Sequence, residues 1–203
     1  MAWKKTRSQN APIWSINSLF LMMDKAFLVW NCQGATSSKF HVVLKSLLQG
    51  YGPYIIVLVE PRIFGTKADR VIRKIGYTNS HRVEATGFSG VVNKDKGSKT
   101  LFTTIYGSPN PMMQERMWID LLKLPIGAQK AWLLAGDFNA TLNANKRKGG
   151  AIRLREGCKA FRTFTQRLGL MDLGFTGPKY TWKRRSLMVR LDRALCNNNW
   201  LQA

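Results

Sequence analysis

The sequence predicts an α/β domain, and two observations lead to this prediction. Short apolar runs of strand length recur along the chain, and between them lie segments whose apolar residues repeat every three or four positions. Strands that alternate with helices are typical of α/β architecture. The chain has 203 residues, 45% of them hydrophobic, which suits one domain with a sizeable core.

The first half of the chain contains two predicted strand–helix units. The strands are expected at 26–29, followed by Trp30 and Asn31, and at 54–59, followed by Glu60 and Pro61. The first helix is predicted from the spacing of Phe40, Val43, Leu44, Leu47 and Leu48, before Gly50 and Gly52. The second is predicted from Ala68, Val71, Ile72 and Ile75, with Gly76 as its C-terminal stop.

The second half continues the alternation. Strands are expected at 101–105 and 131–135, and a final strand at 189–196, preceded by an extended segment at 180–182. Between them, a helix at 156–168 is predicted to turn Phe161, Phe164 and Leu168 inward. Another helix is predicted from core-facing residues after the 101–105 strand, namely Met113, Met117, Trp118 and Leu121.

Polar side chains follow four of these strands at their C-terminal ends. In chain order they are Asn31, Glu60, Tyr106, Asp137 and Asn139. Hard cations that assist phosphoryl chemistry need oxygen ligands of this kind. A Gly-Asp pair after a strand is also common turn chemistry, so the argument depends on the ordered set.

With this ordered set, the chain resembles the endonuclease/exonuclease/phosphatase superfamily, which has the DNase I-like fold. It most closely resembles the endonuclease domain of plant LINE-type non-LTR retrotransposons, which segments 173–182 and 190–195 match in particular. The resemblance extends from about Met23 to the end of the chain. It implies a four-layer α/β sandwich, in which two β-sheets pack face to face with helices outside.

The resemblance also implies an activity, namely the hydrolysis of a DNA phosphodiester assisted by Mg²⁺, with Mn²⁺ as an alternative. Glu60 would bind the metal with help from Asn31, and Asp137 would orient or activate the attacking water. Asn139 would hold the phosphate, and Tyr106 would lie near the scissile phosphate. A turn cap for Asn31 and a core role for Tyr106 are the structural alternatives.

Further site residues are implied near the C-terminus. Thr181 corresponds to a hydroxyl beside the phosphate, and Asp192 to a carboxylate that supports the site. Lys183, Arg184 and Arg185 would contact DNA, although a solvated basic hairpin explains them equally well.

The chain departs from the family pattern in two places. The Ser-Asp-His motif expected after the 190–195 segment is absent, and His41 and His81 stand at other positions. After Gly90, only residues 91–100 precede the next strand, where the family continues through at least two more strands. We therefore expect an internally shortened and C-terminally truncated copy, with the domain at 23–203 lacking its last motif.

Residues 1–22 are predicted to be an atypical N-terminal extension. Their only charged residues are basic, so an organelle transit peptide is the alternative, although no small-residue cleavage site follows. The three cysteines are isolated, which favours a reducing compartment, the nucleus or cytoplasm, and argues against zinc. No apolar stretch reaches membrane-spanning length, so no membrane partner is expected.

The charge of the chain favours a nucleic-acid partner. Lys and Arg number 32 against 11 Asp and Glu, which gives a net charge of +21 and attraction to polyanions. A generally basic protein without a defined partner is the alternative. Carboxylates at Glu60, Asp137 and Asp192 would repel DNA, and a metal ion resolves that conflict.

Three functions compete on this basis. In the first, the chain belongs to an endonuclease that nicks target DNA for an associated reverse-transcriptase domain, and the missing motif is expected to impair its activity. In the second, it is a non-catalytic, basic, nucleic-acid-binding remnant. A lipid or inositol-phosphate phosphatase of the same superfamily is the third.

Overall fold

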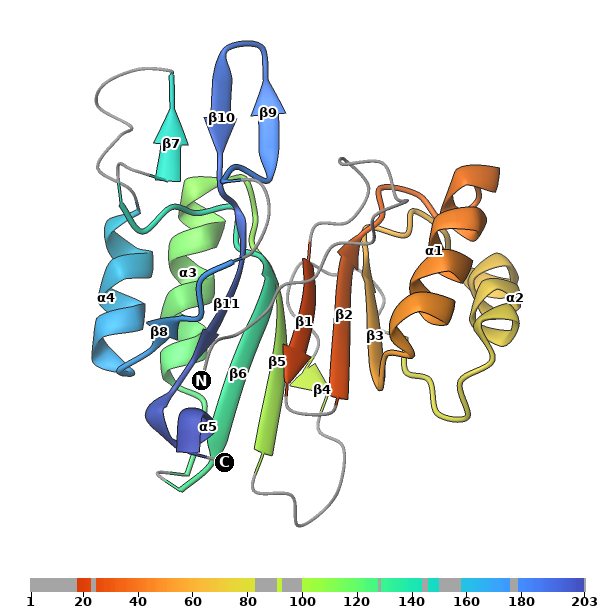
Figure 1. Cartoon of the computed structure of the whole chain (residues 1–203). Helices are drawn as coiled ribbons and strands as arrows, with labels where there is room; N and C mark the ends of the chain where they lie inside the picture. The colour runs from red at the N-terminus through yellow and green to blue at the C-terminus, as the bar shows by residue number, and fades with distance from the viewer. Residues whose placement is uncertain are drawn as a thin grey trace.

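The computed structural model describes residues 18–22, 25–82, 91–92, 100–127, 129–143, 146–149, 158–175 and 179–202. Within these residues, two β-sheets pack face to face and helices cover both outer faces (Figure 1). The predicted four-layer α/β sandwich is therefore confirmed.

The first sheet contains three strands in the order β1-β2-β3. Strand β1 (Ser18–Met22) runs antiparallel to β2 (Lys25–Asn31), and β2 runs parallel to β3 (Ile55–Val59). The helices of this half are α1 (Ser38–Tyr51) and α2 (Gly65–Ile75), on the outer side of the sheet (Figure 1). Because β2 and β3 are parallel, both end at the same edge of the sheet.

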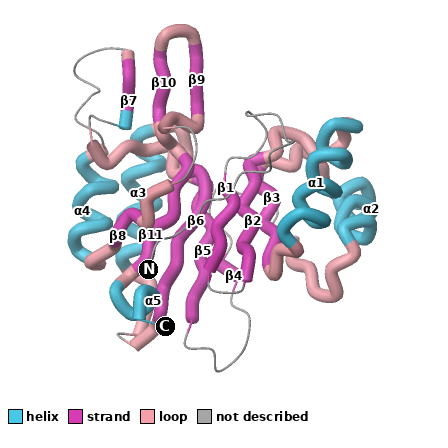
Figure 2. Tube along the Cα trace, in the orientation of Figure 1, coloured by secondary structure: helices cyan, strands magenta, loops and turns pink. Residues whose placement is uncertain are grey.

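The second sheet contains five strands in the order β4-β5-β6-β11-β8. Their bounds are β4 Val91–Val92, β5 Thr100–Tyr106, β6 Ala131–Asp137, β11 Asp192–Cys196 and β8 Met171–Asp172. Strands β5 and β6 are parallel, and β11 is antiparallel to β6. Helices α3 (Pro111–Leu122) and α4 (Lys159–Arg167) pack on the outer side (Figure 2).

Two smaller parts complete the described fold. A three-stranded sheet of β7 (Arg147–Lys148), β10 (Leu187–Val189) and β9 (Trp182–Arg184) projects from one end of the sandwich (Figure 1). Helix α5 (Asn198–Gln202) follows β11, and its buried Trp200 packs against the core between the sheets.

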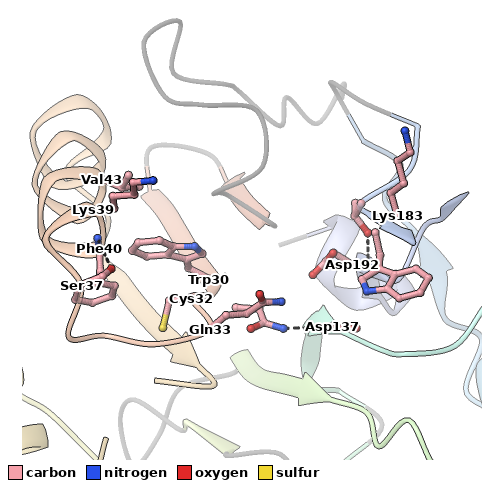
Figure 3. A pocket seen from close by; sticks show the side chains of 13 residues that line it. Trp30, Cys32, Gln33, Ser37, Lys39, Phe40, Val43, Asp137, Lys183 and Asp192 are labelled. Carbon is pink, nitrogen blue, oxygen red and sulfur yellow. Dashed lines mark hydrogen bonds between the residues drawn. The ribbon is translucent and has the colours of Figure 1, made fainter. Parts of the chain in front are cut away.

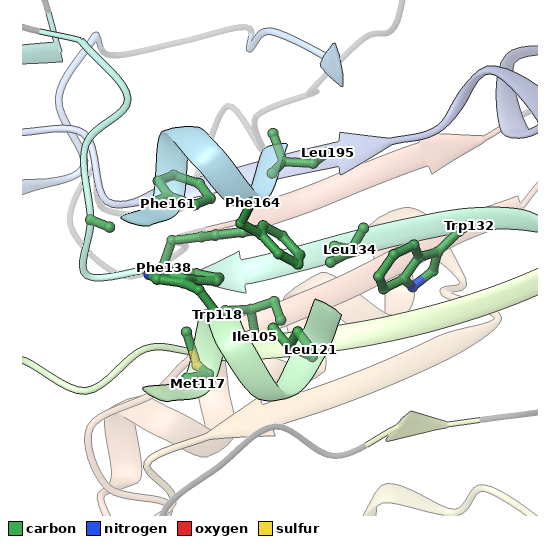
Figure 4. Close-up of a cluster of buried hydrophobic side chains, with 11 residues drawn as sticks. Ile105, Met117, Trp118, Leu121, Trp132, Leu134, Phe138, Phe161, Phe164 and Leu195 are labelled. Carbon is green, nitrogen blue, oxygen red and sulfur yellow. The ribbon is translucent and has the colours of Figure 1, made fainter. Parts of the chain in front are cut away.

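The core consists of three layers of apolar side chains. Between the sheets, Phe27 lies against Phe102 at a ring distance of 5.3 Å. Outside the first sheet, Trp30 stacks on Phe40 of α1 at 5.0 Å. Outside the second, the predicted core residue Trp118 stacks on a phenylalanine of α4 at 4.6 Å, within an aromatic cluster (Figure 4).

The helix ends follow local sequence signals. The Ser37 hydroxyl accepts a hydrogen bond from the backbone N–H of Phe40 at 3.1 Å and caps α1, while Gly52 ends it in a left-handed conformation. Asn110 caps α3 in the same way, and Pro111 occupies its first turn. Among the described residues, no helix has both the length and the apolar character needed to cross a membrane.

Two sequence expectations are corrected by the structure, which also contains one additional short strand. Residues Ser18–Met22 were expected within the extension 1–22, but they form β1, so the sheet begins before Met23. The single strand expected at 189–196 is divided, because the chain leaves β10 at Arg190 and enters the larger sheet only at Asp192. The additional strand, β4, has two residues and pairs with β5 in the segment that the sequence analysis described as shortened.

The helix expected at 156–168 begins at Lys159 and ends at Arg167. Residues 156 and 157 lie outside the described residues, as do residues 1–17 of the predicted extension.

Candidate active site

Both sheets present polar side chains at the same end of the sandwich, where the carboxyl ends of the parallel strands form a rim on each sheet. Asn31 ends β2, Glu60 follows β3, and Tyr106 and Asp137 end β5 and β6. Strands β2 and β3 are parallel neighbours, and so are β5 and β6. The carboxyl ends of the two strands in each pair therefore lie at the same edge of their sheet. The Asn31 side chain donates a hydrogen bond from Nδ2 to Asp137 Oδ2 at 3.3 Å, which joins the rims of the two sheets.

Asp137 is a buried carboxylate, 9% exposed. Burial raises its pKa above the usual range, and the nearby Glu60 charge adds to this effect. Hydrogen bonds from the backbone N–H of Asn139, at 2.9 Å, and from the Asn31 amide partly offset it. The carboxylate therefore has a raised proton affinity and a fixed orientation.

Glu60 is held from two sides. Its Oε1 accepts a hydrogen bond from the Tyr106 hydroxyl, and its Oε2 lies 3.2 Å from Nη2 of Arg62. Burial and the adjacent Glu60 carboxylate raise the pKa of Tyr106, so the phenol stays protonated and acts as the donor. The predicted residues Glu60 and Tyr106 are thus in direct contact.

The backbone at this rim adopts left-handed conformations. Gln33, Glu60, Arg62 and Asn139 have φ angles of 49°, 49°, 51° and 45°. Such angles are unfavourable for residues other than glycine and cluster at functional sites. Segments 32–35 and 59–61 are joined by three backbone hydrogen bonds of 2.8 to 3.0 Å, which hold the conformations of Gln33 and Glu60 in place.

Asp192 and Thr181 approach from the other side of Asp137. In the register of β11 and β6, Asp192 lies directly opposite Asp137, and it is 3% exposed. Thr181 Oγ1 accepts hydrogen bonds from the backbone N–H groups of Leu191 and Asp192 at 3.0 and 3.1 Å. The Thr181 hydroxyl therefore fixes the start of β11, and its own proton can still be donated.

A cavity of about 260 Å³ opens between the two rims (Figure 3). Asn31, Asp137 and Asp192 line it, together with Thr181. Its opposite wall is formed by the end of β2 and the start of α1, through Trp30, Cys32, Gln33, Ser37, Lys39, Phe40 and Val43. Glu60 and Tyr106 are not among the lining residues, so the predicted site extends beyond this cavity.

The predicted DNA-contacting residues separate into two groups. Lys183 on β9 lines the cavity beside Trp182. Arg184 and Arg185 are exposed on the projecting hairpin and do not line it. The structure therefore brings only Lys183 to the cavity.

Gln114 is a site-supporting residue that the sequence analysis missed. It is 7% exposed on α3, and its Nε2 donates to the carbonyl oxygens of Ser108 at 2.9 Å and Asn139 at 2.7 Å. It thus joins the loops that follow β5 and β6. A glutamine among helical residues gives no sequence signal for this role, because glutamine is mostly found on helix surfaces.

The Asn139 side chain adds a second connection between these loops. Its Nδ2 donates to the carbonyl oxygen of Gly107 at 2.7 Å. At Gly107 an added Cβ would lie only 2.2 Å from the carbonyl oxygen of Phe138, so a larger residue does not fit. One Asn139 amide hydrogen is used here, and a primary amide has two.

Two buried arginines also support the rim. Arg193 donates from Nη2 to the carbonyl oxygens of Ala140 at 3.2 Å and Arg190 at 2.9 Å. Asp172 pairs with Arg190 at 3.4 Å and with Arg193 at 3.5 Å. Burial lowers the pKa of Arg193 to about 10. The resemblance identified the 190–195 segment, but only the structure shows that its arginines face inward.

The carboxylate and amide oxygens at the rim are suitable ligands for a hard divalent cation. Asn31 Oδ1 is buried and has no hydrogen-bond partner among the described residues, so this oxygen is available to coordinate a cation. In the part of the chain that the structure describes, no three His, Cys, Asp or Glu side chains form a metal-binding group. Mg²⁺ is nevertheless commonly held by one or two carboxylates, with water and substrate phosphate completing its shell.

Both histidines of the chain lie away from this site. His41 is exposed on α1, where its ring packs edge-on against Phe40, and His81 is exposed after α2. Neither lines the cavity. The described site therefore contains carboxylates, amides and a phenol, but no imidazole.

One comparison with known proteins identifies a family. The model of the endonuclease/exonuclease/phosphatase family matches residues 28–203, a span that contains every site residue described above. No curated protein matches the chain.

Proposed function

The chain belongs to the endonuclease/exonuclease/phosphatase family, and we propose that it is a Mg²⁺-dependent DNA endonuclease from a LINE-type retrotransposon. The family supports a nuclease, phosphodiesterase or phosphatase activity. The observation that carries the finer proposal is the hydrogen bond between Asn31 and Asp137, which joins two carboxylate-bearing sheet rims at one cavity.

In this proposal each residue of the rim has a separate role. Glu60 and Asn31 Oδ1 would hold the metal, whose charge, when bound, offsets that of the phosphate. Asp137 would orient the attacking water and accept its proton, for which a raised pKa is suitable. Asn139 would hold the phosphate through its second amide hydrogen, and Tyr106 would keep Glu60 in position.

DNA is the proposed substrate because of the charge distribution. The chain has a net charge of +21, and the hairpin of β9 and β10 presents three exposed basic residues, Lys183, Arg184 and Arg185, of which Lys183 lines the cavity. Phosphate contacts by such residues position a nucleic acid without reading its sequence. In the full element, an associated reverse-transcriptase domain would use the nick in the nucleus.

A non-catalytic nucleic-acid-binding protein is the second candidate. Two observations favour it: both Glu60 oxygens already have partners in Tyr106 and Arg62, and neither histidine reaches the site. A positioned imidazole contributes roughly 10²- to 10⁴-fold to such reactions. We therefore expect metal binding and weak nicking from the 203-residue polypeptide.

Two measurements test the proposal. Mg²⁺ or Mn²⁺ should raise the melting temperature of the protein, and Glu60→Gln should abolish the increase, because it removes the charge that holds a hard cation. Metal-dependent nicking of supercoiled plasmid should disappear in both Glu60→Gln and Asp137→Asn and persist in the control His41→Ala. Metal stabilisation without nicking would favour the non-catalytic candidate, and no response in either assay would refute the metal site.

A further inference from the structure

Arg62 stands two residues after Glu60 and contacts its carboxylate. The ion pair measures 3.2 Å from Nη2 to Oε2. Both residues adopt left-handed backbone angles, with φ of 49° and 51°, and Pro61 lies between them. This local backbone conformation places the two side chains in contact.

The two partners of Glu60 differ in how firmly they are held. Tyr106 ends the parallel strand β5 and is only partly exposed. The Arg62 side chain is 65% exposed, against 24% for Glu60. An exposed ion pair contributes little stability, so Arg62 is the partner that a competing cation displaces more easily.

The backbone around Arg62 is fixed even though its side chain is exposed. The carbonyl oxygen of Glu60 accepts from the N–H of Gly34 at 2.9 Å, and that of Pro61 accepts from the N–H of Ala35 at 2.8 Å. An arginine released from Glu60 therefore remains at the rim. Its planar guanidinium matches the geometry of a phosphate group.

We propose that Arg62 is a displaceable internal cation, which neutralises Glu60 when no metal is bound and contacts a DNA backbone phosphate when metal takes its place. Metal and phosphodiester then bind cooperatively, because each favours the same position of the Arg62 side chain. This inference rests on the proposed metal site at Glu60.

The first test measures metal affinity without nucleic acid. Free Mn²⁺ is followed by electron paramagnetic resonance during titration of the wild type, Glu60→Gln, Arg62→Gln and Arg73→Gln. Arg73 is the matched control, since it is an exposed arginine in the last turn of α2 and its removal changes the net charge equally. Arg62→Gln should bind Mn²⁺ roughly two- to fivefold more tightly than Arg73→Gln, because the competing ion pair is gone.

The second test measures cooperativity. The affinity for a phosphorothioate DNA duplex, which resists cleavage, is determined with and without Mn²⁺ at constant ionic strength. Mn²⁺ should strengthen duplex binding by the wild type and Arg73→Gln, and clearly less by Arg62→Gln. If Mn²⁺ strengthened duplex binding equally in all three proteins, the proposed contact between Arg62 and a DNA phosphate would be overturned.

The outcomes separate this inference from the proposed function. If Glu60→Gln binds Mn²⁺ as well as the wild type does, the metal site and the proposed function both fail. If Glu60→Gln loses Mn²⁺ binding while Arg62→Gln matches or falls below Arg73→Gln, only the role of Arg62 fails. Equal melting temperatures of the Arg62 and Arg73 variants in metal-free buffer would show that folding is not the cause of any difference.

Discussion

At the residue scale, the pair of Asn31 and Asp137 shows how the site holds a charge that its surroundings disfavour. Asp137 is buried near a second carboxylate, Glu60, and its hydrogen bonds compensate only in part. The Asn31 amide donates to Asp137 through Nδ2, and its Oδ1 has no partner within the described part of the chain. Both features reduce stability in the metal-free protein and suit a site that binds a cation.

Replacement of Asp137 by Asn should stabilise the metal-free protein at neutral pH. A folded-state pKa above the unfolded value of 3.8 means that stability is full below that value and is lost as pH rises through the folded pKa. The substitution removes this loss, and a rotated Asn31 amide can accept from the new side chain through Oδ1. Melting temperatures in chelator should differ at about pH 7.5 and converge toward about pH 4.

A variant that is less stable than the wild type at both pH values would contradict this expectation. It would show that the hydrogen bond from Asn139 to Asp137 contributes more than the desolvation of the carboxylate costs.

Replacement of Gln114 by Met should destabilise the fold. Met has a similar size but cannot donate to the carbonyl oxygens of Ser108 and Asn139. The expected loss is about 1–3 kcal/mol of unfolding free energy, since buried acceptors lose their partner. Urea denaturation measures it. The same change at Gln166, exposed on α4, should stay within about 0.5 kcal/mol, and equal losses at both positions would contradict the role of Gln114.

At the scale of elements, the hairpin of β9 and β10 is a projecting unit with a fixed base. Strand β10 pairs with both β7 and β9, and the chain passes from it to β11 through the buried Arg190. The guanidinium of Arg190 lies 4.0 Å from the Phe175 ring centre and pairs with Asp172. The exposed tip is thus rigidly attached to the strand that carries Asp192.

Removal of the basic side chains from this hairpin should weaken DNA binding in a salt-dependent manner. A variant with Ala at Lys183, Arg184 and Arg185 should reduce the slope of log affinity against log salt by up to about 0.9 for each phosphate that the hairpin no longer neutralises. The slope is measured by fluorescence anisotropy with a labelled duplex. The control removes three exposed basic residues from α2, namely Lys67, Arg70 and Arg73. If the control variant reduced the slope more than the hairpin variant did, the DNA would contact α2 rather than the hairpin.

At the scale of the whole molecule, charge is the dominant feature. With a net charge of +21, many phosphate contacts and their released counterions should contribute to binding. For about six to ten phosphate contacts, affinity for duplex DNA should fall by about 10³- to 10⁵-fold between about 50 and 200 mM salt. Equilibrium binding across this range measures the fall. Affinity that does not change with salt would argue against a polyanionic partner.

The sequence predicted most elements because their signals are local. The period of apolar residues and the glycines at positions 52 and 76 define helices within a few residues of their observed ends. The apolar run at 131–135 was likewise sufficient to identify β6, which is buried throughout. The expectation failed at 189–196, because β10 ends at Val189, β11 begins at Asp192, and the buried Arg190 lies in the break between them.

The sequence by itself determined the order of the polar residues at the strand ends, and with it the type of chemistry that the rim can support. Tertiary structure alone decided which of them meet: Asn31 and Asp137 are 106 positions apart and are brought together only by the packing of two sheets. It also decided that Tyr106 contacts Glu60 and that Gln114 joins two loops. Periodicity reports which side of an element is buried, whereas contacts between elements depend on how those elements pack, which no local pattern encodes.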